Sequence, residues 1–404
     1  MHIHFKELAK RLGCSITIAR SLADRSRELI TNAGLGNNTP LLLVCDSVTY
    51  EALGKRLVKE LDSPFLILND TPYANMETVS FIRAKQAGAL IAVGSGTIND
   101  LCKYASFLDN KPYAVFPTAP SMNGYCSANA SITIHGHKQT LAAHLPKGVF
   151  CDLSVLAAAP TRLIQSGLGD SLCRPTAQAD WLLSHLLFAT SYDPLPFSLL
   201  APYEQELFHH ADKLIAGDTN IIKLLIITLL VSGFGMVIAG GSYPASQGEH
   251  LIAHTMEMQH GNALQEAYHG EQIGVTTLFM AGLQQQVLSK PLYLKKYANT
   301  DIQNAISGYF GRTLAKSVYD AYHKKHILYE KYDGINERLQ KEDKAIRDAL
   351  YRVTLHESVL RGVLQKAGAP TQAKNIGWND KELVQAARYA KYIRDRFTFI
   401  DLIY

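Results

Sequence analysis

The first 160 residues alternate short apolar runs with longer amphipathic stretches, and this alternation restricts the possible folds more than any other feature. The apolar runs cover residues 41–45, 65–68, 89–93 and 113–117, and helical patterns over 50–61 and around 79–88 lie between them. Strands that alternate with helices are typical of a parallel sheet. We therefore predict a parallel α/β domain over residues 1–160, with a hairpin over 131–143 before its last apolar run.

Strand patterns fade after Pro160, and helical patterns continue to Tyr404. We predict an all-helical second domain over residues 161–404. Its most apolar stretch, residues 224–241, has about the minimum length of a membrane span. Four glycines interrupt this stretch, which leads directly into a histidine-containing segment, so a buried helix is the better interpretation.

A glycine turn follows the apolar run at 89–93 and precedes a helical pattern over 98–108. In a strand–turn–helix unit, glycines let the backbone approach a pyrophosphate, and the helix N-terminus favours its charge. An ordinary strand-to-helix turn has the same appearance, so the turn alone does not decide between the two. Asp46 directly follows the apolar run at 41–45, where a carboxylate either accepts a hydrogen bond from a ribose hydroxyl or caps the next helix.

One carboxylate and several histidines form a second pattern: Asp170 in GLGDSL, His250 and His254 in GEHLIAH, and His269 in YHGEQIGV. One carboxylate and two imidazoles can hold a divalent metal and leave a coordination position open, as catalytic sites do. His250 and His254 are four residues apart and share one face of a helix, so one can bind metal while the other meets substrate. The chain has 15 histidines, and any one of them alone is more often a surface or hydrogen-bonded core residue.

Five motifs occur in one order between residues 40 and 280: AVGSGTINDL, PTAPSMNGYCSANASI, GLGDSL, PASQGEHLIAH and HGEQIGV. Together they resemble the metal-dependent dehydrogenase superfamily that contains glycerol dehydrogenase, dehydroquinate synthase and sn-glycerol-1-phosphate dehydrogenase. The bacterial glycerol-1-phosphate dehydrogenases are the most similar. The resemblance implies a dehydroquinate synthase-like fold, with a Rossmann-like dinucleotide-binding domain followed by a helical metal- and substrate-binding domain.

The resemblance also implies an activity and a set of site residues. The expected reaction interconverts glycerol 1-phosphate and dihydroxyacetone phosphate, with NAD or NADP and one divalent metal, for which zinc is favoured over nickel or iron. Asp170, His250 and His269 would bind the metal, and His254 would contact substrate and supply a proton. The residues expected to line the nicotinamide cofactor are Gly94, Ser95, Gly96, Thr97, Ile98, Thr118, Ser121 and Ser127.

Two positions depart from the family pattern. The family's SMDG or SHDG stretch offers an Asp to the substrate hydroxyls, whereas this chain has Asn123, which can hydrogen-bond a hydroxyl but cannot take its proton. The family tends to have SRPASGSEH, whereas this chain has Tyr243 in place of the Arg, which removes a donor suited to phosphate. The phosphorylated substrate is therefore less firmly indicated than the fold or the metal site.

Other interpretations stay open at this point. The same scaffold could act on a different polyol or ketone, or as a dehydroquinate synthase-like lyase, although that family usually has Glu where this chain has Asp170. The changes at Asn123 and Tyr243 would also suit a non-catalytic descendant. The net charge of +4 and the scattered basic residues argue against a nucleic-acid partner. Six dispersed cysteines indicate reduced packing residues, and we expect a cytoplasmic protein that forms homo-oligomers.

Overall fold

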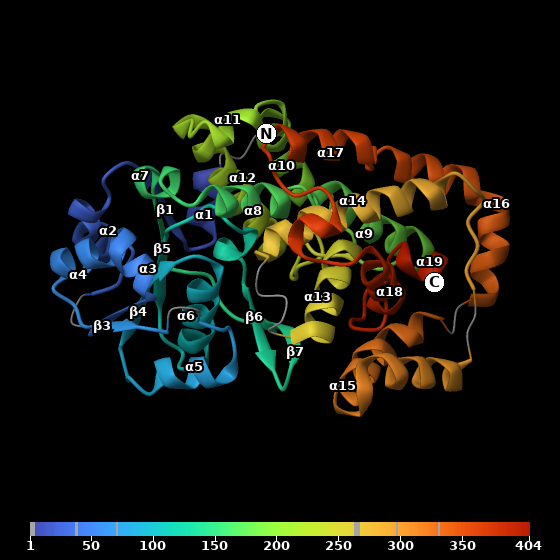
Figure 1. Cartoon of the computed structure of the whole chain (residues 1–404), viewed down its shortest axis with the longest axis horizontal. Helices are drawn as coiled ribbons and strands as arrows, with labels where there is room; N and C mark the ends of the chain where they lie inside the picture. Colours follow the sequence, from blue (N-terminus) through green and yellow to red (C-terminus); the bar gives the residue numbers. More distant parts are fainter. Residues whose placement is uncertain (1–4, 37–38, 70–71, 262–266, 296–297, 330–331) are drawn as a thin grey trace.

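A six-stranded parallel sheet forms one side of the molecule (Figure 1). The computed structural model describes residues 5–36, 39–69, 72–261, 267–295, 298–329 and 332–404. In spatial order the strands are β1 (Ser15–Ala19), β8 (Gly148–Asp152), β5 (Tyr113–Pro117), β4 (Ala89–Gly94), β2 (Leu41–Cys45) and β3 (Phe65–Ile67). Every neighbouring pair is parallel. The predicted α/β fold and its predicted strands are confirmed, whereas β1 was not predicted.

Helices cover both faces of this sheet. They are α1 (Phe5–Arg11), η1 (Ala23–Arg25), α2 (Ser26–Asn32), α3 (Ser47–Thr49), η2 (Tyr50–Gly54), α4 (Lys55–Leu61), α5 (Met76–Arg83) and α6 (Gly96–Leu108). Side chains alternate along each strand, so Leu90 and Ala92 pack in one core with α5 and α6, while Ile91 and Val93 pack in another with α2 and α4. This double coverage explains why the central strands are apolar throughout.

An antiparallel hairpin leaves the sheet and reaches the helical part of the chain. Its strands are β6 (Asn129–Ile134) and β7 (His137–Ala142), which confirms the predicted hairpin. Figure 1 shows the hairpin extending below the sheet toward α13 (Gly248–His260), and β7 contacts that helix. The hairpin therefore connects the α/β part to the helix that contains His250 and His254.

The described chain after Asp152 contains helices only, as predicted. Besides α13 they are α7 (Leu153–Ala157), α8 (Thr161–Ser171), α9 (Arg174–Phe188), α10 (Leu195–His209), α11 (Asp212–Ile215), α12 (Thr219–Ile238), α14 (His269–Leu288), α15 (Asn299–Tyr329), α16 (Tyr332–Tyr351), α17 (Glu357–Lys366), η5 (Ala373–Ile376), α18 (Asp380–Ala390) and α19 (Ile400–Ile403). One core cluster contains residues of β4 and α6 together with residues of α8 and α12. The division into domains at residue 160 stays a prediction, because this core is continuous across it.

The apolar stretch at 224–241 lies largely in α12, and most of that helix is buried. It is long and apolar enough to cross a membrane, but it packs against α8, α10 and η3 (Asn123–Cys126). Its lack of a polar face is explained by this central position. The six cysteines are buried and form no disulfide, as predicted.

Candidate functional site

Glycines at the crossing of α8 and α14 bring Asp170 and His269 together. A Cβ atom added at Gly270 would lie 2.5 Å from the carbonyl carbon of Ser166 and 2.7 Å from its Oγ. One added at Gly169 would lie 3.0 Å from the carbonyl carbon of Gly270. The Ser166 hydroxyl also accepts a hydrogen bond from the Gly270 amide at 3.0 Å. Glycine is therefore required here, since only hydrogen in place of a side chain permits this backbone approach.

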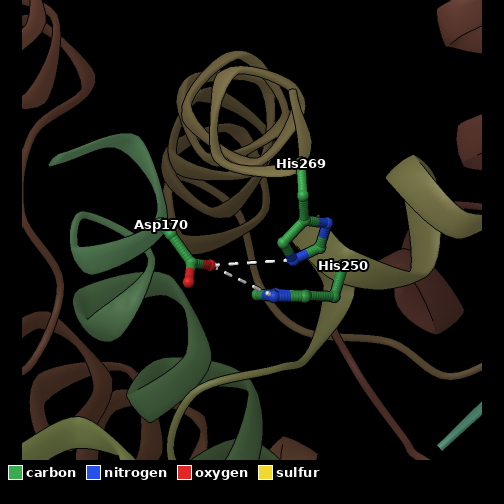
Figure 2. Close-up of side chains that lie close together, drawn as sticks. All are labelled: Asp170, His250 and His269. Carbon is green, nitrogen blue, oxygen red and sulfur yellow. Dashed lines mark ion pairs between the residues drawn. The ribbon is translucent and has the colours of Figure 1, made fainter. Parts of the chain in front are cut away.

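Asp170 is the centre of the cluster in Figure 2 and is almost completely buried. Its Oδ2 accepts a hydrogen bond from the Asn123 amide at 2.7 Å. Its Oδ1 has no hydrogen-bond partner among the described residues, and lies 3.6 Å from Nε2 of His250 and 3.8 Å from Nε2 of His269. A buried carboxylate oxygen thus faces two imidazole nitrogens at more than hydrogen-bonding distance.

The carboxylate of Glu249 orients the ring of His250. Nδ1 of His250 donates to Oε1 of Glu249 at 2.9 Å, which leaves the lone pair of Nε2 directed at Asp170. Glu249 is itself held by the Gln247 amide at 2.7 Å and by the Thr176 hydroxyl at 3.1 Å. A carboxylate behind a histidine fixes its tautomer and raises its basicity, as in many metal sites.

The charge states of Asp170 and His269 favour binding of a cation. Burial raises the pKa of Asp170, but the neighbouring His250 and His269 outweigh burial, so the net pKa is lowered. Burial lowers the pKa of His269 to about 4. Burial also lowers the pKa of His250, but the neighbouring carboxylates of Asp170 and Glu249 more than offset it, so the net pKa is raised and an ion bound at Nε2 would displace a proton. An ionised Asp170 beside a neutral His269 matches the forms in which these residues bind metals.

His254 lies one helical turn after His250, as their spacing predicts, and its ring centroid is 5.9 Å from that of His250 and 6.0 Å from that of His269. Its Nδ1 accepts a hydrogen bond from Arg394 at 3.3 Å, because a guanidinium can only donate. Burial, followed by the positive charges of Arg394 and Lys138, lowers the pKa of His254 well below 6.5. Neutral His254 therefore has its proton on Nε2.

A cavity of about 230 Å³ collects most of the predicted site residues. It is bounded by β6 and β7 on one side and by α8, α13 and the start of α14 on another. The predicted residues that line it are Ser95, Gly96, Thr97, Ser121, Asn123, Ser127, Asp170, His250, His254 and His269. The glycine turn and the Asp/His cluster, which are about 75 to 175 residues apart in sequence, thus open onto one cavity.

Four predicted cofactor residues lie outside the lining of this cavity: Asp46, Gly94, Ile98 and Thr118. A Cβ at Gly94 would lie 2.6 Å from Cγ1 of Ile98, so these two residues pack against each other beneath the turn. Asp46 caps α3, where its Oδ1 accepts from the Thr49 amide at 2.7 Å. The capping alternative is therefore observed for Asp46, and its contact with ribose stays a prediction.

Four residues in or near the cavity were not predicted. Lys138 and Thr140 of β7 line it, and Arg394 donates to Thr140 as well as to His254. Glu249 was also missed, although a carboxylate directly before a candidate metal-binding histidine is a usable signal. The sequence has no comparable signal for Arg394, which is 140 residues away from His254.

Asp170, His250 and His269 fit a divalent metal ion. Ligand atoms of a tetrahedral ion with bonds of about 2.1 Å are separated by roughly 3.4 Å. The Oδ1-to-Nε2 distances of 3.6 and 3.8 Å are close to this value, and the three residues form a group that could hold a metal ion. Oδ1 of Asp170 has no hydrogen-bond partner in the described part of the chain, so its lone pairs are available to a metal ion.

The structure gives each departure from the family pattern a definite environment. Asn123 lines the cavity, and its buried Nδ2 has no partner among the described residues. Tyr243 stacks on Trp181, with ring centroids 5.6 Å apart, and the guanidinium of Arg396 lies 4.7 Å from its ring centroid. The place of the family's arginine is thus occupied by an aromatic ring with another arginine above it.

Comparisons with known proteins show the family and the fold of the chain. A family described as iron-containing alcohol dehydrogenase matches residues 17–160. The chain is 32% identical over 288 residues to glycerol-1-phosphate dehydrogenase [NAD(P)+] of Thermococcus sibiricus, covering 70% of this chain and 80% of that protein. It is 29% identical over 401 residues to the enzyme of the same name from Bacillus subtilis, covering 96% and 90% of the two chains. The fold is similar to that of NADH-dependent butanol dehydrogenase A from Thermotoga maritima, with a TM-score of 0.62, 15% identity, and 95% and 90% of the chains covered.

Proposed function

Because the chain belongs to the glycerol-1-phosphate dehydrogenase family, which lies among the iron-containing alcohol dehydrogenases, we propose that it is an NAD(P)-dependent, metal-dependent dehydrogenase that interconverts glycerol 1-phosphate and dihydroxyacetone phosphate. The observation that supports this most directly is the Asp170–His250–His269 cluster, which opens onto the same cavity as the glycine turn. A dehydrogenase of this type needs its metal and its nicotinamide within reach of one substrate carbon.

Each residue around the cavity has a separate role in the proposed reaction. Asp170, His250 and His269 hold the ion, which when bound supplies Lewis acidity to the substrate oxygen while the nicotinamide exchanges a hydride with the carbon. Asn123 donates from its free Nδ2 to a substrate hydroxyl. His254 donates from Nε2, and its neutral form adds no positive charge beside the cation. The amides after Ser95 at the start of α6 bind the pyrophosphate.

We propose zinc as the metal, with nickel or iron as alternatives, because an Asp/His/His set accepts all three. The choice between NAD and NADP, cytoplasmic location and homo-oligomer formation stay predictions. If the substrate is not glycerol 1-phosphate, we expect Asn123 and Tyr243 to be responsible, because they are the two departures from the family pattern.

The test measures oxidation of NADH and NADPH by protein loaded with zinc or nickel. Dihydroxyacetone phosphate and unphosphorylated dihydroxyacetone are compared as substrates, with Asp170→Asn as the inactive variant and Asp24→Asn, an exposed carboxylate on η1, as its control. We expect turnover of the phosphate ester, loss of turnover in Asp170→Asn and full activity in Asp24→Asn. Turnover of the unphosphorylated ketone alone would indicate that the substrate is another polyol or ketone. Absence of turnover with both would support a lyase or a non-catalytic descendant.

A further inference from the structure

Arg394 places an unpaired positive charge beside the catalytic cavity. Its guanidinium donates to the Thr140 hydroxyl at 2.7 Å and to Nδ1 of His254 at 3.3 Å, both neutral groups. In the described part of the chain no carboxylate forms an ion pair with it, and its exposed neighbour Asp395 acts only at longer range. Burial, then the charge of Arg396, lowers the pKa of Arg394 to about 9, so it stays protonated at neutral pH. Arg394 is partly buried, and a partly buried cation without an anion loses hydration that a bound anion would compensate.

A second cavity, of about 490 Å³, extends the first one toward Arg394. The two share four lining residues: Asn129, Lys138, Thr140 and Ser242. Arg394 and Arg396 also line the second cavity. Lys138 is already paired with Glu257 at 2.8 Å. The other charged residues that line the second cavity are Lys324, Arg394 and Arg396 against Asp320 and Asp395, so the net charge without Lys138 is positive by one.

The segment that holds both arginines is rigidly anchored. The completely buried ammonium of Lys325 donates to the carbonyls of Lys391 and Arg396, at 2.6 and 3.1 Å, and to Oδ1 of Asp401 at 2.7 Å. Arg396 donates to the Ser242 hydroxyl at 2.7 Å. The position of Arg394 is therefore set before any ligand arrives, which lowers the entropic cost of binding.

We infer that Arg394, together with Thr140, forms the binding site for the phosphate group of the substrate. The inference rests on the proposed function for the identity of the ester, but its chemistry is general. A guanidinium has five donors, and the two contacts described leave donors free for a bidentate phosphate contact. His254 separates Arg394 from His250 and His269 by one side chain, and the phosphorus of the ester is three bonds away from the reacting carbon. Arg394 thereby replaces the donor that is missing at Tyr243.

The test compares Arg394→Gln with Arg352→Gln, which makes the same change at an exposed arginine on another surface. Inorganic phosphate is titrated calorimetrically into metal-free protein saturated with NADH, so that the glycine turn is filled. We expect at least tenfold weaker phosphate binding in Arg394→Gln and at least tenfold higher KM for dihydroxyacetone phosphate. The change in KM with unphosphorylated dihydroxyacetone should be several-fold smaller, because that substrate is affected only through the hydrogen bond from Arg394 to His254. Arg352→Gln should behave as the unmodified protein. If the glutamine variant does not fold, Arg394→Lys serves as the test. It keeps the positive charge but not the bidentate geometry of the guanidinium, so its phosphate affinity should be intermediate.

Each outcome decides the inference. Unchanged phosphate affinity in Arg394→Gln would overturn it. A loss of activity with NADPH but not with NADH would also overturn it, since the anion bound by Arg394 would then be the 2′-phosphate of the cofactor. If the unmodified protein binds phosphate through Arg394 but does not reduce dihydroxyacetone phosphate, the anion site stands and the proposed reaction fails.

Discussion

Replacing Gly270 by alanine tests whether the close crossing of α8 and α14 builds the metal site. A Cβ at this position would overlap the Ser166 carbonyl oxygen and lie 2.5 Å from the carbonyl carbon, whereas ordinary contacts begin near 3.4 Å, so the helices must separate by at least about 0.9 Å. Overpacking of this kind costs about 1–3 kcal/mol. The same shift would widen the 3.8 Å between Asp170 Oδ1 and His269 Nε2 toward about 4.7 Å. That is too wide for two ligands of one ion, so metal affinity should fall at least tenfold.

Gly282→Ala is the matched control, because it lies on the same helix and a Cβ there meets nothing within 4 Å. It should gain up to about 1 kcal/mol from the helix propensity of alanine. Urea unfolding followed by circular dichroism measures the free energy of unfolding of both metal-free variants, and competition with a chelator measures their zinc affinity. Equal unfolding midpoints for the two variants, or unaltered zinc affinity in Gly270→Ala, would refute the reasoning.

Three other changes test the support around the site. Glu249→Gln should lower metal affinity by about 10- to 100-fold in the chelator competition, because His250 loses the carboxylate that orients it. Lys325→Met should lower the free energy of unfolding by about 3–5 kcal/mol in urea, because the buried Asp401 loses the cation of its ion pair, and should also weaken phosphate binding. Burial lowers the pKa of Lys391 from 10.5 to about 8, so the unfolded chain binds the proton more tightly and stability should rise between pH 8 and 10.5. In urea titrations at several pH values, Lys391→Met should lack this rise, which amounts to at most about 3 kcal/mol.

Much of the fold and part of the site could be predicted from local sequence patterns. The strands β2, β4 and β5 were predictable because they are buried on both faces and are apolar throughout. By contrast, β1 is a half-exposed edge strand of five residues, so its pattern is weak. The candidate metal ligands were predicted because each lies in a recognisable motif. Arg394 lies in no such motif, and only the folded chain brings it to His254.

The charges in the cavity explain why a basic residue is suited to position 394 and an aromatic residue to position 243. The ring of Tyr243 is packed between Trp181 and Arg396, and the charge of Arg396 already lowers the pKa of Arg394. A guanidinium at position 243 would add a third positive charge to this group, in which the carboxylates of Asp395 and Glu249 already act on Arg396. An aromatic ring at position 243 instead gives Arg396 a cation–π contact and keeps the charge near what one phosphate dianion can balance. The tyrosine is thus consistent with a phosphorylated substrate once the position of Arg394 is known, although in the sequence alone it argues against one.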